Sequence, residues 1–197
     1  MSIFWDQRYR ENNFAYGKKP NQFFAEVLDD YKPKKLLLPA DGEGRNAVYA
    51  ATRGWQVDAF DFSPVARDNA IALAHEQGVS INYFLADFNF LALPEKTYHF
   101  IALIYTHMPS QLRLNVHRTL VKSLKPGGVL MAELFSEKQL DHGSGGPKNP
   151  DYLINCEILA HDFAGMNIKL NEQKKIQLEE GPFHRGEAEV VRFLAKK

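Results

Sequence analysis

The stretch Lys35-Leu-Leu-Leu-Pro-Ala-Asp-Gly-Glu-Gly-Arg-Asn46 runs from a short apolar segment into a turn that contains two glycines. A continuous apolar segment of this length is typical of a strand buried in a parallel sheet. Gly42 and Gly44 allow the backbone to approach a ligand that a Cβ atom would push away. Arg45 to Arg53 is predicted to be a helix, whose first amides can bind a ligand at the same turn. A tight turn without a ligand is the alternative interpretation.

Strand and helix patterns alternate around this stretch. Strands are predicted at 35–39, 56–60, 81–85, 98–105 and 129–135, and helices at 21–31, 45–53, 64–77 and 111–124. Such alternation predicts an α/β fold, a parallel sheet with helices on both faces that binds ligands at the carboxyl ends of its strands. After residue 136 the pattern changes to a helix at about 152–163 and two β-rich runs at 168–178 and 187–195. These two runs are predicted to pair as an antiparallel hairpin at the edge of the sheet.

The composition is that of a globular protein. The chain has 197 residues without an obvious linker, which favours a single domain. Its 24 basic and 24 acidic residues cancel, which argues against a nucleic acid as partner. The single cysteine, Cys156, excludes an internal disulfide. We see no signal peptide and no apolar run that could span a bilayer, so we expect a cytoplasmic protein without a membrane partner.

Two acidic residues follow the second and third predicted strands. Asp61 comes nineteen residues after Gly42, the spacing at which a carboxylate accepts hydrogen bonds from the hydroxyls of a ribose. The alternative is a helix cap, although Ser63 is better placed for that role. Asp87 could receive the amine of an adenine while Phe88 offers its backbone amide, or it could be a solvated turn residue. Because three successive strand ends meet at one edge of a parallel sheet, the pattern favours one shared ligand.

These motifs resemble those of the class I S-adenosylmethionine-dependent methyltransferases, over nearly the whole chain. The branch that looks closest is the small bacterial one that includes the tellurite-resistance methyltransferase and, more distantly, thiopurine methyltransferase. The matching segments are 37–46 with Gly54, Val57 and 61–63; 86–88; 124–128; and 181–186 with 190–192.

The resemblance implies a three-layer Rossmann-like fold with a seven-stranded, mostly parallel sheet and an antiparallel edge hairpin. It also implies S-adenosylmethionine as the cofactor. The residues expected to bind it are Tyr16, Ala40, Asp41, Gly42, Gly44, Arg45, Asp61, Phe62, Asp87, Phe88 and Tyr105.

Two positions depart from the family pattern. The family usually has an acid where this chain has Leu38, and a glycine where it has Ala40. We expect binding to persist, because Ala40 is small and Asp41 supplies a carboxylate three residues on.

The candidate catalytic groups are His184 and Arg185, in the loop before the last strand. The resemblance places this pair near the methyl donor, with Arg192 as a third basic position; a solvated hairpin loop is the alternative. His107, after the fourth strand, could orient or deprotonate a substrate, or could simply be hydrogen-bonded to a neighbouring backbone group. The other histidines show no metal-ligand spacing, so we expect no metal site.

The N-terminal segment contains four aromatic residues, Trp5, Tyr9, Phe14 and Tyr16. They could pack against the core or form a lid over the sulfonium, where aromatic faces favour a cation. The glycine-rich loop at 141–149 is a second lid candidate. The expected organisation is thus a lid-like segment at 1–20, a cofactor-binding core at 21–136, and a substrate loop, helix and hairpin at 137–197.

The predicted function is methyl transfer from S-adenosylmethionine to a small molecule with a soft or anionic nucleophile, such as a thiol, selenium or tellurium species, by a monomer or homodimer. The alternatives are an O- or N-methyltransferase of another metabolite and a protein that binds the cofactor without transfer. A dinucleotide oxidoreductase is disfavoured because Ala47 stands where a third glycine is needed. A nucleic-acid methyltransferase is disfavoured by the zero net charge and by the sequence Tyr-Thr-His-Met at 105–108.

Overall fold

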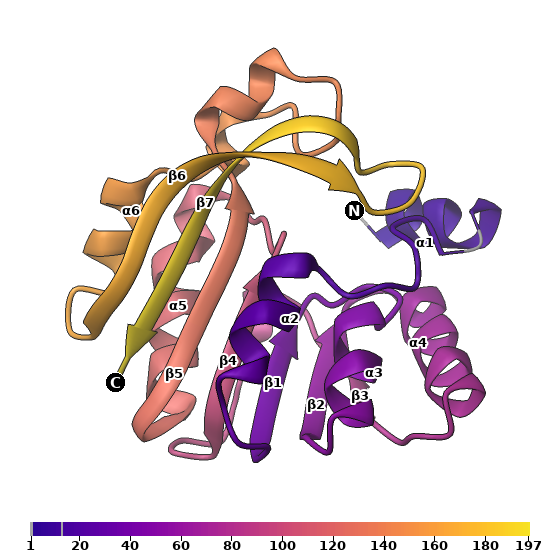
Figure 1. The fold of residues 1–197 in the computed structure, drawn as a ribbon, viewed down its shortest axis with the longest axis horizontal. Coiled ribbons are helices and arrows are strands. Elements are labelled where there is room, and N and C mark those ends of the chain that lie inside the picture. The colour runs from indigo at the N-terminus through magenta and orange to yellow at the C-terminus, as the bar shows by residue number, and fades with distance from the viewer. Residues whose placement is uncertain (1, 13) are drawn as a thin grey trace.

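The computed structural model describes residues 2–12 and 14–197 and has a seven-stranded sheet in the order β3-β2-β1-β4-β5-β7-β6 (Figure 1). The strands are β1 (Lys35–Pro39), β2 (Gln56–Asp61), β3 (Asn82–Leu85), β4 (Tyr98–Ile104), β5 (Leu124–Phe135), β6 (Asn167–Glu179) and β7 (Arg185–Lys196). The first five strands pair in parallel, and β7 lies antiparallel between β5 and β6. The predicted fold class is confirmed, including the antiparallel edge hairpin.

Helices cover both faces of the sheet. They are α1 (Ser2–Glu11), α2 (Gln22–Asp29), α3 (Arg45–Thr52), α4 (Pro64–Glu76), α5 (Ser110–Ser123) and α6 (Cys156–Asp162). Because side chains alternate along a strand, Leu36 and Leu38 pack with α2, α3 and α4, whereas Leu37 faces the core formed with α5 and α6. The result is a three-layer fold. The segments that follow the carboxyl ends of β1, β2 and β4 lie at the same edge of the sheet. None of the helices in the described ranges is both long and apolar enough to cross a membrane.

Three elements differ from the sequence-based expectation. Helix α1 was not predicted, since its aromatic and charged residues show no clear apolar periodicity. The helix expected at 152–163 is a short 3-10 turn at Pro150–Tyr152 followed by α6, because Asn155 accepts the amide of Ile158 and starts a new helix there. Strand β5 begins at Leu124, which pairs with Tyr98, rather than after the glycine turn at 127–128.

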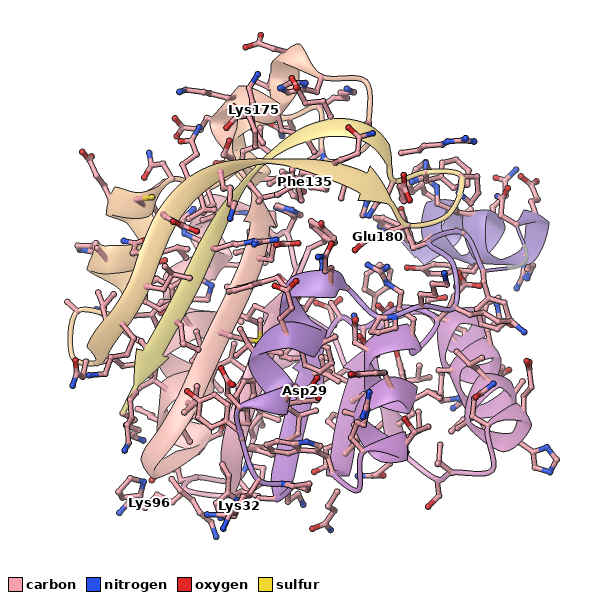
Figure 2. The ribbon with its side chains drawn as sticks, in the orientation of Figure 1. Asp29, Lys32, Lys96, Phe135, Lys175 and Glu180 are labelled. Carbon is pink, nitrogen blue, oxygen red and sulfur yellow. The ribbon has the colours of Figure 1, made fainter. Side chains whose placement is uncertain are left out.

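The hairpin of β6 and β7 is long enough to bend over the carboxyl ends of the central strands (Figure 1). Figure 2 shows Phe135 and Glu180 beneath this arch and Lys175 on its outer side. The tip of the hairpin reaches the N-terminal segment, since a Cβ atom on Gly181 would lie 2.5 Å from the amide nitrogen of Gly17. A hairpin at the edge of the sheet therefore contributes residues to the same space as β1, β2 and β4.

Candidate active site

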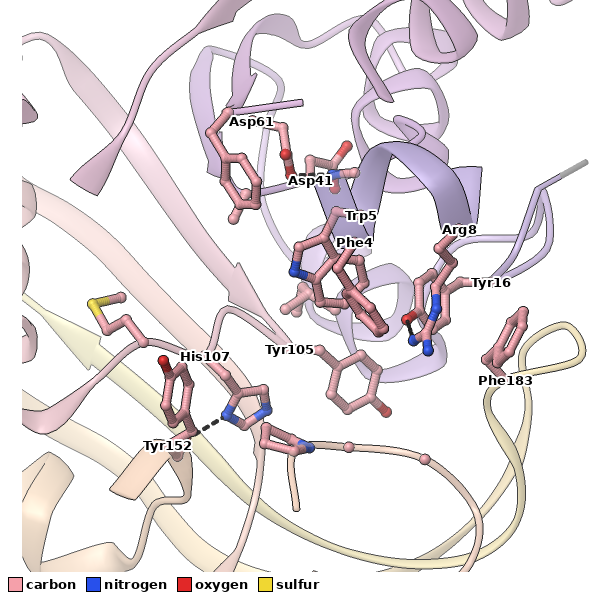
Figure 3. A pocket seen from close by; sticks show the side chains of 18 of the residues that line it. Phe4, Trp5, Arg8, Tyr16, Asp41, Asp61, Tyr105, His107, Tyr152 and Phe183 are labelled. Atoms are coloured by element: carbon pink, nitrogen blue, oxygen red, sulfur yellow. Dashed lines mark hydrogen bonds between the residues drawn. The ribbon is translucent and has the colours of Figure 1, made fainter. Parts of the chain in front are cut away.

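One cavity of about 1230 Å³ lies at the carboxyl ends of the strands. Pockets for single drug-sized ligands usually measure about 300–1,000 Å³, so this cavity has room for a cofactor and an acceptor together. Of the predicted site residues, those that line it are Tyr16, Ala40, Asp41, Gly42, Arg45, Asp61, Phe62, Asp87, Phe88, Tyr105 and His184. Figure 3 shows side chains of α1, with Asp41 and Asp61, on one side of the cavity and His107 and Tyr152 on the other. Gly44 and Arg185 are predicted site residues that do not line it.

The turn after β1 combines close packing with backbone strain. Ala40, where the family has glycine, takes a φ of +50°, a left-handed conformation that costs energy for a residue with a Cβ. A Cβ on Gly42 would lie 2.9 Å from the hydroxyl of Tyr9, so this turn accepts no side chain there. Gly44 has another role: its Cβ would lie 2.5 Å from that of Ala70, so the glycine allows α3 to pack against α4.

Asp61 is buried at the end of β2, with 4% of its surface exposed. Its two carboxylate oxygens accept the amides of Gly42 at 3.2 Å and Ser63 at 3.0 Å. Burial raises the pKa of Asp61 to about 6, against the lowering effect of these amides. Ser63 caps α4 by accepting the amide of Ala66, so Asp61 is not the cap. Each carboxylate oxygen can accept a second hydrogen bond, which leaves capacity for the hydroxyls of a ribose.

Asp87 is a turn residue at the border of the cavity. It is exposed, it lines the cavity, and its Oδ1 accepts the backbone amide of Asn89 at 2.8 Å and that residue's side-chain amide at 2.7 Å. These bonds start a short 3-10 turn at Phe88–Phe90. Phe88 packs edge-on against Phe60 of β2, so the turn has a fixed position beside the cavity.

Asp41 binds the first turn of α3. Its Oδ1 accepts the side-chain amide of Asn46 at 3.0 Å, and its Oδ2 accepts the amide of Ala47 at 3.0 Å. Burial raises the pKa of Asp41 to about 7, although the same hydrogen bonds oppose the shift. Asp41 therefore fixes the first turn of α3, whereas the Leu38 side chain is buried in the core.

His184 is buried among aromatic rings at the hairpin side of the cavity. Its ring centroid lies 4.4 Å from that of Tyr16, 4.7 Å from that of Tyr105 and 5.3 Å from that of Phe135. Its Nδ1 lies 3.4 Å from Oε2 of Glu180. A carboxylate can only accept, so Nδ1 carries the proton and Nε2 has a lone pair. Burial lowers the pKa of His184, with Glu180 opposing the shift, so the imidazole is neutral at pH 7.

Glu180 is a site residue that the sequence did not indicate. Its Oε2 also accepts Nη2 of Arg45 at 2.8 Å, and its Oε1 accepts the side-chain amide of Asn21 at 3.0 Å. Burial by itself raises the pKa of Glu180, but His184 and Arg45 together lower it by more than burial raises it. The net shift of the Glu180 pKa is therefore downward. The only signal in the sequence is its position four residues before His184. A charged carboxylate thus orients the imidazole from behind.

The other predicted basic residues lie elsewhere. The Arg185 side chain is exposed at the start of β7, and its backbone amide donates to Ser144. Arg192 donates its Nε to Glu133 at 2.7 Å and lies over the ring of Phe23. The expectation that Arg185 faces a substrate has no support in this geometry, because its side chain is exposed and does not line the cavity.

His107 lines the cavity but is saturated by backbone groups. Its Nδ1 donates to the carbonyl of Tyr152 at 2.8 Å, and its Nε2 accepts the amide of Phe135 at 3.3 Å. Burial lowers the pKa of His107 to about 4. This is the structural alternative considered above, and it leaves the imidazole no lone pair for a substrate proton.

Both lid candidates border the cavity. Trp5, Tyr9 and Tyr16 line it, whereas Phe14 packs toward Val48 and Leu73 instead. Three of the four aromatic residues are therefore placed at the cavity, and Phe14 packs against the core. Residues 143 and 145–149 of the glycine-rich loop line the opposite side, where Gln139 holds Ser144 and Gly145 by hydrogen bonds of 2.9 and 3.1 Å.

Comparisons with known proteins bear on the domain and the fold. Residues 39–128 match the family model described as a methyltransferase domain. No curated protein sequence matches the chain significantly.

Three solved structures share its fold. One, described by the conversion of a disulfide bond into a thioacetal group during echinomycin biosynthesis, has a TM-score of 0.77 at 18% identity, covering 100% of this chain and 92% of the other. TehB from Haemophilus influenzae has a TM-score of 0.74 at 15% sequence identity, and the match covers 90% of this chain and 62% of the TehB chain. The N-methyltransferase NodS from Bradyrhizobium japonicum WM9, in complex with S-adenosyl-L-homocysteine, has a TM-score of 0.73 at 13% sequence identity. The match covers 100% of this chain and 97% of the NodS chain. The family model supports the predicted enzyme class and cofactor, a methyltransferase that uses S-adenosylmethionine, and the solved structures support the predicted fold.

Proposed function

We propose that this chain, whose residues 39–128 match a methyltransferase domain, transfers a methyl group from S-adenosylmethionine to a small molecule with a thiol, selenol or similarly soft nucleophile. The observation that carries the proposal is the cavity itself. It brings together the turn at 40–42, Asp61 and Asp87 on one side and the buried pair of His184 and Glu180 near the other. The assignment to the tellurite-resistance and thiopurine branch is part of this proposal.

The cofactor half of the cavity has the groups that S-adenosylmethionine requires. We assign the ribose hydroxyls to Asp61 and the adenine to Asp87 with the amide of Phe88. The hydrogen bond of 3.2 Å from the Gly42 amide to Asp61 supports this assignment, since it holds the carboxylate beside the turn. Tyr16 and Tyr105 offer aromatic faces to a cation near His184. The bound cofactor supplies an electrophilic methyl group on a sulfonium that leaves as a neutral thioether.

His184 is the group that we propose handles the acceptor's proton. Its lone pair at Nε2 can take the proton of a thiol or selenol, while Glu180 stabilises the imidazolium that forms. Because burial keeps His184 neutral at pH 7, the base form is the resting form. Soft nucleophiles need little further activation, since their protons are acidic enough for a neutral imidazole to accept. Aligning the nucleophile and excluding water remain the main contributions of the cavity.

The cofactor assignment is tested by isothermal titration with S-adenosylmethionine, S-adenosylhomocysteine and NADH. We expect the first two to bind and NADH not to bind. Saturable binding of NADH alone would contradict the assignment. A protein that only binds the cofactor would pass this test and fail the next one.

Transfer is tested with thiols, thiopurines, and selenite or tellurite with a reductant, by following S-adenosylhomocysteine formation. We expect His184→Ala to lower kcat by about 100-fold, the scale of general base catalysis, with cofactor affinity nearly unchanged. Arg185→Ala should change kcat much less, because its side chain is exposed outside the cavity. Equal rates for His184→Ala and the unmodified protein on the best acceptor would overturn the role of His184.

A further inference from the structure

Three cationic side chains line the cavity among the residues that the structure describes: Arg8, Arg45 and Lys148. Arg45 is neutralised by Glu180. Lys148 is exposed, and its Nζ donates to the carbonyl of His142 at 3.1 Å. Arg8 is different, because no carboxylate of the described residues lies within ion-pair distance of it. Among the described residues, the cavity therefore contains one partly buried guanidinium whose charge is not balanced by an ion pair.

Aromatic rings from two distant parts of the chain hold the Arg8 guanidinium. Its central carbon lies 4.6 Å from the ring centroid of Phe4, 5.3 Å from that of Trp5 and 4.5 Å from that of Phe183. Figure 3 shows Arg8 between Phe4 and Trp5 on one side and Phe183 on the other. Rings stabilise a cation through its flat face and leave the N–H donors at its edge. This arrangement holds the guanidinium in place without using up its hydrogen-bond donors.

Arg8 is connected to the proposed base by a single residue. Its Nη1 donates to the hydroxyl of Tyr16 at 3.0 Å, and the ring of Tyr16 lies 4.4 Å from that of His184. The guanidinium has five N–H donors, so this bond leaves donors for a ligand. A carboxylate binds such a fork of donors in a bidentate fashion. An acceptor that carries its nucleophile at His184 could thus place an anionic group at Arg8 across a short spacer.

We propose that Arg8 is a specificity-determining residue that binds a carboxylate of the methyl acceptor. This inference rests on the proposed function and adds a substrate class to it: small thiols that carry a carboxylate. It also assigns anion recognition to α1 rather than to Arg185 or Arg192. The rings of Phe4, Trp5 and Phe183 then serve to position a cation and exclude water from its faces.

The kinetic test compares mercaptoacetate with 2-mercaptoethanol, which carry a thiol at the same spacing but differ in the carboxylate. In Arg8→Met we expect KM for mercaptoacetate to rise about tenfold or more, the scale of losing charge-assisted hydrogen bonds, and KM for 2-mercaptoethanol to change less than about threefold. Arg8→Lys keeps the charge, so its KM for mercaptoacetate should lie between those of the unmodified protein and Arg8→Met. Arg10→Met, at an exposed position of the same helix, should affect neither thiol. Equal changes for both thiols in Arg8→Met would overturn the proposal.

A binding test decides the inference even if no acceptor is methylated, in which case the proposed function fails by itself. Trp5 lies close enough to Arg8 to report on ligands, and Trp55→Phe removes the other tryptophan. With S-adenosylhomocysteine present, mercaptoacetate should change the Trp5 fluorescence saturably. The change should be lost in Arg8→Met and kept in Arg10→Met, with circular dichroism confirming that both variants fold. A saturable change of the same affinity in folded Arg8→Met would refute a carboxylate site at Arg8.

Discussion

Arg45 and Glu180 stand 135 positions apart in the chain, yet their side chains form a buried ion pair of 2.8 Å. Arg45 begins α3 at the cofactor turn, and Glu180 follows β6 at the tip of the hairpin. The pair therefore joins the two halves of the cavity. Its exposed fractions, 7% and 12%, mean that either charge would be costly without the other.

Glu180→Gln should lower the free energy of unfolding by about 3 kcal/mol, because it leaves the Arg45 charge buried without a partner. Urea unfolding measures this change. Glu187→Gln is a matched control in the same hairpin, since its ion pair with Lys175 is exposed and its loss should change the free energy of unfolding far less. Similar losses in both variants would show that the Arg45 pair has no special importance.

Asp61→Asn should weaken S-adenosylhomocysteine binding about tenfold or more at pH 8, the scale of charge-assisted hydrogen bonds. Alanine is less suitable, because the carboxylate is buried and accepts two backbone amides. The raised pKa of about 6 adds a pH dependence: affinity should fall as pH drops through 6, when the carboxylate is protonated. Isothermal titration from pH 5 to 8 measures both effects. Asp68→Asn, on the exposed face of α4, should bind like the unmodified protein at each pH.

Ala40→Gly should raise the free energy of unfolding by about 0.5–1 kcal/mol. The left-handed conformation at φ +50° destabilises the folded state when the residue is alanine, and glycine removes this strain. Glycine also makes the unfolded chain more flexible, but the free energy lost in that way is smaller than the strain removed. Thermal unfolding measures the gain. Ala51→Gly, in the regular helix α3, should instead lose about 1 kcal/mol. A loss in both variants would mean that Ala40 is not strained.

Asp41→Asn should change how stability depends on pH. The folded-state pKa of about 7 lies above the ordinary value of 3.8, so the folded protein binds the proton more tightly between these values. Stability then falls as pH rises from about 4 to 7. Asparagine removes this penalty and should gain on the order of 1 kcal/mol at pH 8 but nothing at pH 4. Urea unfolding at the two pH values checks the difference; a gain of equal size at both would contradict the shifted pKa.

The fold and the cofactor half of the site could be predicted because they depend on local patterns. Apolar runs, glycine turns and strand-end acids lie close together in the chain, and parallel strands bring them to one edge. The hairpin half could be predicted only in part. His184 lines the cavity and its exposed neighbour Arg185 does not, and a dipeptide in a loop does not reveal which of its two side chains will be buried.

Arg8 and Glu180 could not be found from local patterns at all. Glu180 acts through Arg45 and His184, and Arg8 through Tyr16 and Phe183, so each role depends on contacts that only the folded chain creates. Helix α1 shows the same limit, because its aromatic residues pack toward a cavity rather than along one apolar stripe.

The insertion of β7 between β5 and β6 has a consequence for how the site is assembled. The last of the seven strands in chain order is an interior strand, so neither β6 nor the hairpin tip has a place on the sheet until β7 has paired with β5. During synthesis the turn after β1 can therefore form long before the wall that carries His184 and Glu180. The cavity is complete only when the hairpin has closed against β5, so the proposed site is assembled last from its C-terminal side.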